Sequence, residues 1–189
     1  MRKARYAGIG ALVLVLILAL STAAGIAKSE GTATLRVIAP TNAIQVGESF
    51  PVQITGEGLT NLGAFEFQFL FDPSVVNTSV WNIQLSDFLG STGRQTGVLR
   101  LSSAAGGNPG PMFGAYSYGS PLGPTGAGNL ASIVVTAEAP GVSQLDLGAV
   151  QITDVDGNIL SYEIVPSAVL VANPVETRPL YLPLLLASR

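Results

Sequence analysis

Three oxygen-bearing side chains in one short stretch are candidates for metal binding. Asp154, Asp156 and Asn158 stand at alternate positions, and carboxylate and amide oxygens are ligands that Ca²⁺ prefers. An EF-hand loop needs glycine at its sixth position and glutamate at its twelfth. Here the glycine is fourth and the twelfth residue is Val165. The stretch therefore predicts an aspartate–glycine hairpin turn, with a calcium site as the alternative.

A second candidate is the polar side of an aromatic strand. Glu66 and Gln68 are two residues apart, so in an extended strand both side chains lie on the same face. Ala64 and Leu70 share that face, which mixes polar and apolar side chains as protein interfaces do. These four residues are the predicted partner-binding set. The alternative is an ordinary solvated strand face.

Aromatic side chains offer a third kind of chemistry, since a ring face can stack on a sugar. Tyr116 and Tyr118, with Phe113, lie within residues 104–128, which are rich in glycine and proline and predict a long loop. Trp81 is the only tryptophan. Carbohydrate binding by Tyr116, Tyr118 and Trp81 is one hypothesis. The alternative is that these rings pack on the core.

The composition excludes several classes of enzyme. The chain of 189 residues has no cysteine and no histidine, which removes disulfides, Cys/His zinc sites and nucleophile–histidine mechanisms. Glycoside hydrolysis needs two carboxyl groups that face one cleft, and the 12 acidic residues are scattered along the chain. We therefore expect no enzymatic activity and no cofactor.

The chain begins with a segment typical of export signals. Arg2, Lys3 and Arg5 precede an apolar run over residues 8–20, and small residues follow. Residues 1–27 are therefore predicted to be a signal peptide, or a membrane anchor if uncleaved. Without the three basic residues, 6 basic and 12 acidic residues remain, a net charge of −6, which disfavours nucleic acid as a partner. The predicted location is extracellular, secreted or cell-surface associated.

The element that must position the polar face is a strand with phenylalanine at every second position. Phe65, Phe67, Phe69 and Phe71 fall on one face of an extended chain. Burying such rings contributes about 1.5–3 kcal/mol each, so this face must lie on a core. About nine short segments of strand character, separated by glycine and proline, and no helical periodicity predict an all-β sandwich.

The domain predicted from this pattern covers residues 28–173. Residues 174–189 form an apolar tail that Pro174 and Pro179 separate from the domain. The run over residues 180–186 is too short to span a membrane. The tail is interpreted either as an edge segment that packs on the sandwich or as a surface-association signal.

Several landmarks follow one another in a set order along the chain, namely Gln45–Phe50, Leu62–Pro73, Gly126–Val135, Pro140-Gly141 and Asp154–Gly157. This order resembles that of cohesin domains, in the superfamily of cohesin-like and carbohydrate-binding-module sandwiches. The resemblance covers residues 34–173 and implies a nine-stranded jelly-roll β-sandwich of cohesin-like type. It also implies binding of dockerin modules or, in related modules, of cellulose or chitin.

The resemblance implies a site as well as a fold. Dockerin recognition in cohesins uses one sheet face, including polar residues on the strand before an aspartate–proline pair, here Asp72-Pro73. Glu66 falls where cellulosomal cohesins often carry aspartate. Ala64 falls where they often carry asparagine, so one hydrogen-bonding group is missing. The implied function is docking of a dockerin-like or other extracellular protein in polysaccharide-degrading or surface assemblies. Direct polysaccharide binding and cell-surface adhesion are the alternatives.

Overall fold

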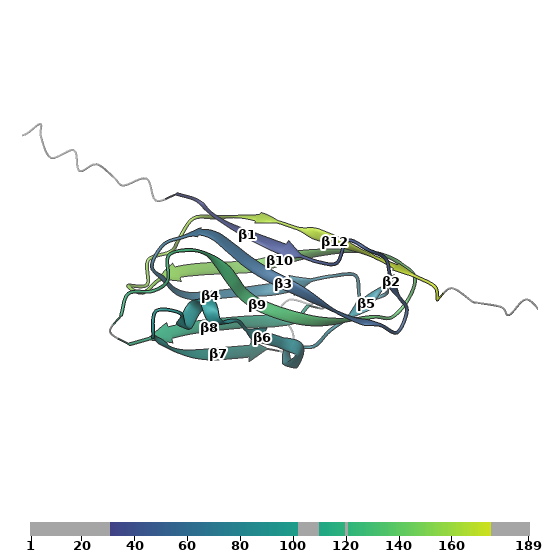
Figure 1. The fold of residues 1–189 in the computed structure, drawn as a ribbon, viewed down its shortest axis with the longest axis horizontal. Coiled ribbons are helices and arrows are strands. Elements are labelled where there is room, and N and C mark those ends of the chain that lie inside the picture. The colour runs from purple at the N-terminus through teal and green to yellow at the C-terminus, as the bar shows by residue number, and fades with distance from the viewer. Residues whose placement is uncertain (1–30, 102–109, 120, 175–189) are drawn as a thin grey trace, which may run out of the picture.

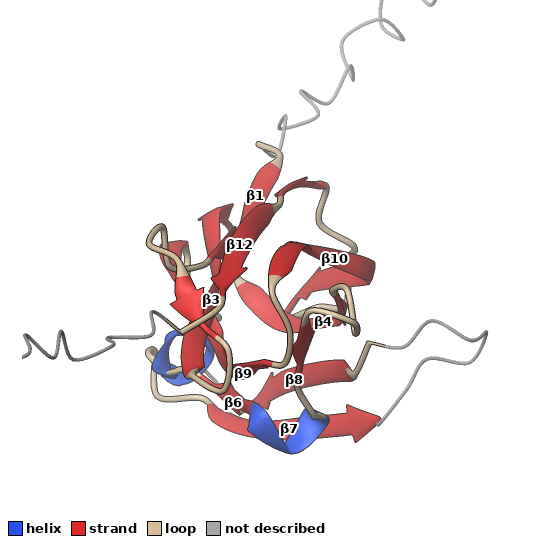
Figure 2. Cartoon of the chain, turned by 90° about the vertical axis from the view of Figure 1, so that its right-hand side faces the viewer, coloured by secondary structure: helices blue, strands red, loops and turns tan. Residues whose placement is uncertain are grey.

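Two β-sheets pack face to face in the computed structural model, which describes residues 31–101, 110–119 and 121–174 (Figure 1). One sheet, called the β9 sheet below, has the strand order β11-β1-β3-β9-β5, and β6 also pairs with β9. The other, the β4 sheet, has the order β2-β12-β10-β4-β8-β7. Viewed end-on, β3 and β9 lie on one side and β10, β4 and β8 on the other (Figure 2).

The described residues contain twelve strands, nine of which have four residues or more, and two short 3-10 helices. The predicted sandwich of about nine strands is therefore confirmed, since the additional strands are only two or three residues long. The elements are β1 (Ala33–Ile38), β2 (Ile44–Gln45), β3 (Ser49–Leu59), β4 (Leu62–Leu70), β5 (Val76–Asn77), η1 (Val80–Asn82), β6 (Ile83–Leu85), η2 (Asp87–Gly90), β7 (Gln95–Leu101), β8 (Met112–Tyr118), β9 (Gly126–Ala137), β10 (Gly141–Asp154), β11 (Tyr162–Val165) and β12 (Ser167–Ala172).

The phenylalanine strand lies at the centre of the core, as its periodicity predicts. Strand β4 runs between β10 and β8, and Phe65, Phe67 and Phe69 are at most 4% exposed. The rings of Phe65 and Phe67 are stacked with centroids 6.3 Å apart, and Phe113 of β8 lies 5.9 Å from Phe67. Phe71 follows the end of the strand and is half-buried. Alternation along β4 therefore fixes which side chains point outward.

The expectation of a long loop over residues 104–128 is wrong for residues 112–118, which form strand β8 between β4 and β7. Its inward residues, Phe113 and Ala115, are buried, and the outward residues alternate with them. The period of two is present in the sequence, but Gly114 and the glycines and prolines on both sides obscure it. Strand β6 is short because the 3-10 turn η1 occupies the three residues before it.

The predicted signal peptide at residues 1–27 and residues 175–189 of the predicted tail lie outside the described residues. Within the ranges that the structure covers, no helix is long and apolar enough to cross a membrane.

Candidate docking face

The outward side of β4 carries the four residues that the sequence analysis selected for partner binding. Glu66 is exposed, and Ala64 and Leu70 are partly exposed. Gln68 is only 3% exposed, and its Nε2 donates a hydrogen bond to the carbonyl oxygen of Gly110 at 3.1 Å. The expectation that Gln68 lies open to a partner is therefore wrong. The backbone at Gly110 covers it, and a Cβ there would collide with the carbonyl of Phe69.

The two tyrosines lie on the same outer face as Glu66, and they belong to a strand. Tyr116 of β8 stands opposite Ala64 of β4 and opposite Gly97 of β7. The Tyr116 and Tyr118 rings are 6.3 Å apart, and the two residues are 44% and 51% exposed. The Tyr116 ring covers Gly97, where a Cβ would come within 2.5 Å of the ring. The residues predicted for protein and for sugar binding therefore share one face.

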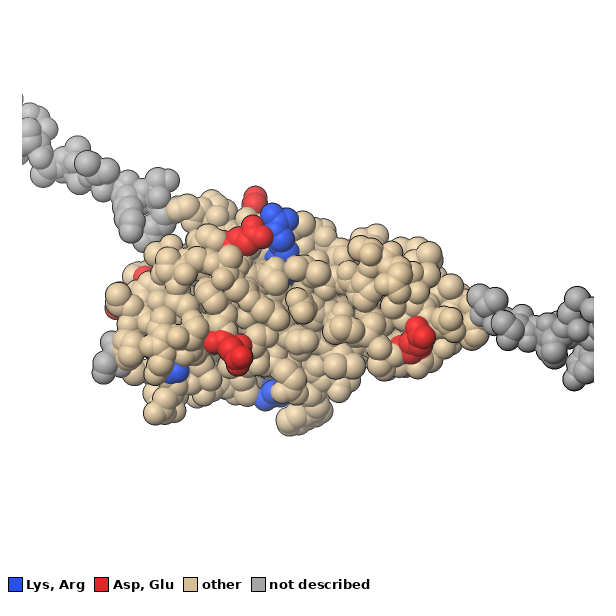
Figure 3. Space-filling view, in the orientation of Figure 1, with Lys and Arg blue, Asp and Glu red and all other residues tan. Residues whose placement is uncertain are grey.

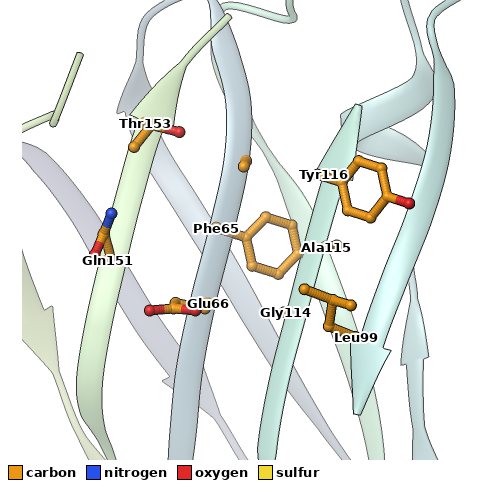
Figure 4. A pocket seen from close by; sticks show the side chains of 9 residues that line it. Phe65, Glu66, Leu99, Gly114, Ala115, Tyr116, Gln151 and Thr153 are labelled. Carbon is orange, nitrogen blue, oxygen red and sulfur yellow. The ribbon is translucent and has the colours of Figure 1, made fainter. Parts of the chain in front are cut away.

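A shallow depression of about 110 Å³ lies in the middle of this face (Figure 4). Gly114 contributes no side chain, which leaves space between Glu66 on β4 and Leu99 on β7, its register partners. A bulge in β10 brings Gln151 opposite Glu66. The residues that line the depression are Ala64, Phe65, Glu66, Leu99, Gly114, Ala115, Tyr116, Gln151 and Thr153.

Leu99, Gly114, Gln151 and Thr153 were not predicted as site residues. Leu99 is 62% exposed and Leu101, on the same side of β7, is 59% exposed. Apolar residues at alternate outward positions of an edge strand are the signal that could have identified them, because sheet edges usually carry charge or proline there. We call the outward surface of β10, β4, β8 and β7 the β4 face.

The charge on the β4 face is negative. Glu66 of β4 and Asp146 of β10 have outward register positions. The described residues contain three cations, and none belongs to this face. Arg36 lies in the β9 sheet, Arg94 donates hydrogen bonds to the Ser117 hydroxyl and to backbone carbonyls after β8, and Arg100 points inward from β7. In Figure 3, which views the molecule as in Figure 1, charged side chains are scattered spots on a mostly uncharged surface.

Trp81 lies apart from the tyrosines. It belongs to η1, is 72% exposed, and its ring lies 5.9 Å from the guanidinium carbon of Arg100. Arg100 alternates with the outward residues Leu99 and Leu101 along β7, so Trp81 is on the other side of that strand from the β4 face. The three aromatic residues predicted for sugar binding therefore do not form one site.

The candidate calcium residues form a tight turn after β10. The Asp154 Oδ1 accepts hydrogen bonds from the backbone N–H groups of Asp156 (2.9 Å) and Asn158 (2.8 Å), and Oδ2 accepts one from the Asn158 side chain (2.8 Å). These hydrogen bonds lower the pKa of Asp154 because they stabilise the charged carboxylate. The bond from the Asn158 side chain has the largest effect. In the described segments no group of three or more acidic, histidine or cysteine side chains could hold a metal ion.

Comparisons by sequence give no relative. No protein-family model matches the chain, and no curated protein matches it. Any assignment therefore depends on the arrangement of the strands, and a fold is shared more widely than a function.

Comparisons of structure give a consistent result. A non-cellulosomal cohesin from Archaeoglobus fulgidus is 12% identical with a TM-score of 0.55, and the match covers 76% of this chain and 93% of that one. A cohesin module of a Clostridium perfringens family 33 glycoside hydrolase is 18% identical with a TM-score of 0.57 over 76% and 98%. A cohesin solved in a type I cohesin–dockerin complex from Clostridium thermocellum is 12% identical with a TM-score of 0.55 over 75% and 100%. The chain has a cohesin-like fold.

Proposed function

We propose that this chain is an exported, non-enzymatic docking module that binds a dockerin-like protein partner through its β4 face. The observation that carries the proposal is the exposed apolar and aromatic surface around the Gly114 depression, flanked by Glu66. A sheet face that exposes leucine and tyrosine side chains beside a carboxylate has the composition of a recognition surface. The basic segment and apolar run within residues 1–27 support export.

The exposed apolar side chains support binding because they are grouped. Leu99, Leu101, Tyr116 and Tyr118 are each 44–62% exposed and lie on the adjacent strands β7 and β8. Grouped exposed apolar side chains on a monomeric protein commonly mark interaction sites. Tyrosine is enriched among the residues that dominate binding energy, so the tyrosine pair is the expected centre of the interface.

The depression and the charge define the partner further. A partner side chain that enters the space above Gly114 would contact Leu99 and Tyr116 and lose its contact with water. Glu66 and Asp146, with no cation among the described residues of this face, favour a partner surface that carries positive charge. Several structures with this fold were solved as cohesin–dockerin complexes, which supports a dockerin-like module as the partner.

The test is a capture experiment with two matched variants. The purified protein, Leu99→Asp and Val134→Asp are each immobilised and exposed to the secreted proteins of the source organism. Leu99 and Val134 are both exposed apolar strand residues, 62% and 45%, but they lie on opposite sheets. We expect one protein with a dockerin-like repeated calcium loop to bind the parent and Val134→Asp, to be lost from Leu99→Asp, and to be released by a calcium chelator.

Two outcomes would contradict the proposal. Equal capture by Leu99→Asp and the parent would place the interface elsewhere. Loss of capture with Val134→Asp alone would move the interface to the other sheet. Circular dichroism of both variants checks that the fold is retained, and both substituted side chains already contact water.

A further inference from the structure

The tripeptide Asn77-Thr78-Ser79 takes no part in the docking face. It has the pattern Asn-x-Ser/Thr, with any residue except proline in the middle, that accepts N-linked glycans in exported proteins. The chain has eight asparagines, and only Asn77 begins such a pattern. A pattern of three residues also occurs by chance, so its position in the fold decides whether it can act as an acceptor.

The local backbone directs the two essential side chains outward. Asn77 is the last residue of β5 and lies opposite Thr136 of β9. The preceding residue, Val76, is fully buried in the core, so Asn77 lies on the outer side of the β9 sheet. Ser79 is also extended, with φ −127° and ψ 162°. Asn77 and Ser79 are both exposed, whereas Thr78 between them is only partly exposed.

The hydrogen bonds of the tripeptide follow the same division. The Thr78 hydroxyl donates to the carbonyl oxygen of Val134 at 2.6 Å, which ties the middle residue to the sheet. Among the described residues, neither the Asn77 amide nor the Ser79 hydroxyl makes a side-chain hydrogen bond. The amide that would receive a glycan and the hydroxyl that the pattern requires are therefore both available to an enzyme.

The surroundings of Asn77 leave room for a bulky substituent. Strand β5 is the last in the strand order of the β9 sheet, next to β9, so within the described part of the chain no further strand covers its outer edge. A shallow polar groove of about 180 Å³ lies beside it. Its amide, hydroxyl and carboxylate groups can bond to sugar hydroxyls. The groove is lined by Asn77, Thr78, Ser79, Asn82, Thr136 and Glu138.

We propose that Asn77 is an N-glycosylation site. The donor is an oligosaccharide linked to a lipid through phosphate, and the catalyst is a membrane-bound oligosaccharyltransferase. The Asn77 amide nitrogen forms a bond to the anomeric carbon of the first sugar while the bond from that carbon to the phosphate oxygen breaks. The amide nitrogen loses one proton, and the lipid phosphate leaves. This modification rests on the proposed export of the chain but not on its docking function.

The position of the glycan has two consequences. It would project from the β9 sheet, whereas Leu99 and Tyr116 of the docking surface belong to the other sheet, so docking and glycosylation are compatible. A bulky, hydrophilic group at an edge strand would also block pairing with the edge of another sheet. The glycan would therefore keep this side of the sandwich soluble and leave the β4 face open to its partner.

The test is mass spectrometry of the protein recovered from the culture medium of the source organism. We expect an intact mass above that of the polypeptide. Cleavage before Asp72 and Asp87 releases residues 72–86, and fragmentation of this peptide should locate the glycan on Asn77. Asn82 lies in the same peptide and is exposed, but it lacks the pattern and should be unmodified.

Two neighbouring hydroxyl variants, produced in the same organism, form a matched pair. Ser79→Ala removes the hydroxyl that the pattern requires and should abolish the modification, whereas Ser79→Thr should retain it. Thr78→Ala removes a hydroxyl that is hydrogen-bonded but lies at the unrestricted middle position, so the glycan should remain. Asn77→Gln should lose the glycan and still capture the same partner as the parent. Circular dichroism checks the fold of each variant.

Several outcomes would overturn the proposal, and they separate it from export. Exported protein with the unmodified mass would exclude glycosylation and leave export intact. Unmodified protein found only inside the cell would contradict both. A glycan on residues 72–86 that persists in Asn77→Gln or Ser79→Ala would place the attachment on another residue and exclude Asn77 as the acceptor.

Discussion

The two outer faces of the sandwich share a backbone geometry and differ in side-chain chemistry. The β4 face exposes Leu99 and Tyr116 around a depression and carries acidic side chains. The outer face of the β9 sheet, called the β9 face below, carries mainly hydroxyl and amide groups. Its outward residues include Thr34, Arg36, Gln53, Thr55, Ser132 and Thr136.

Charge is also arranged differently on the two faces. The β9 face contains the single ion pair found in the described ranges, Arg36 Nε to Glu57 Oε1 at 3.2 Å. An exposed pair of this kind contributes about 0–1 kcal/mol, so the β9 face satisfies its own charges and is otherwise well hydrated. The β4 face leaves Glu66 without an ion pair among the described residues. The two faces therefore offer different side chains to a partner, although they share one backbone architecture.

The difference between the two outer faces is not expected to extend to the core that lies between them. Phe67 is 2% exposed and its ring contacts Phe65 and Phe113. We expect Phe67→Ala to lower the free energy of unfolding by about 3–5 kcal/mol, because it leaves a cavity. Urea denaturation followed by circular dichroism measures this. A decrease of less than about 1 kcal/mol in the free energy of unfolding would mean that the packing of the two sheets does not depend on the Phe67 ring.

The largest difference in partner binding between the two faces is expected at Tyr116. We expect Tyr116→Ala to weaken binding of the captured partner about 30-fold, or about 2 kcal/mol, as for a tyrosine near the centre of an interface. The free energy of unfolding should fall by about 1 kcal/mol or less, the usual value of a cross-strand contact. Calorimetry with the partner and urea denaturation give the two values. Val134→Ala on the β9 face is the control, and an equal loss of affinity there would remove the distinction between the faces.

A smaller effect is expected from the charge on the β4 face. Glu66→Gln removes a carboxylate but keeps the size of the side chain. We expect the association rate to fall and to depend less on salt, with an affinity loss of about 1 kcal/mol or less. Stopped-flow measurements at several salt concentrations test this. Glu57→Gln on the β9 face should leave the rate unchanged, and a similar salt dependence for both variants would contradict the assignment.

The smallest effect is expected at the Asp154 turn, which belongs to neither face. Hydrogen bonds hold the pKa of Asp154 below its usual range, so its contribution to stability is complete above the unfolded pKa of about 3.9. The contribution is lost as the pH falls through the lower, folded pKa. The melting temperature of Asp154→Asn should therefore fall less steeply than that of the parent as the pH drops below about 4. Identical acid profiles would contradict this, and added Ca²⁺ should not change the melting temperature of the parent.

Local periodicity is what made much of the fold predictable. Phe65, Phe67 and Phe69 specify a strand and its buried side without information from elsewhere in the chain. Strand β8 was missed because its outward positions include Gly114, and because the segments around it are rich in glycine and proline. Those residues usually indicate a loop, but pairing with β4 and β7 overrides this preference.

The site was less predictable because it combines distant residues. Glu66 was placed correctly on an outward strand face, since alternation alone decides that. Gln68 has the same alternation but is covered by Gly110, which is 42 residues away. The depression depends on side chains from β4, β7, β8 and β10, and no short window of sequence contains such a combination.

The strand directions have a mechanical consequence. The two ends of the described domain, near residues 31 and 174, emerge at opposite ends of the long axis, and β1 and β12 run along that axis (Figure 1). Tension applied between these ends would load the backbone hydrogen bonds of β1 with β3 and of β12 with β10 in shear, so that many must break together. We expect single-molecule pulling between residues 32 and 173 to require a higher force than pulling across the sheet, between β7 and β12. Equal forces in both directions would exclude this anisotropy.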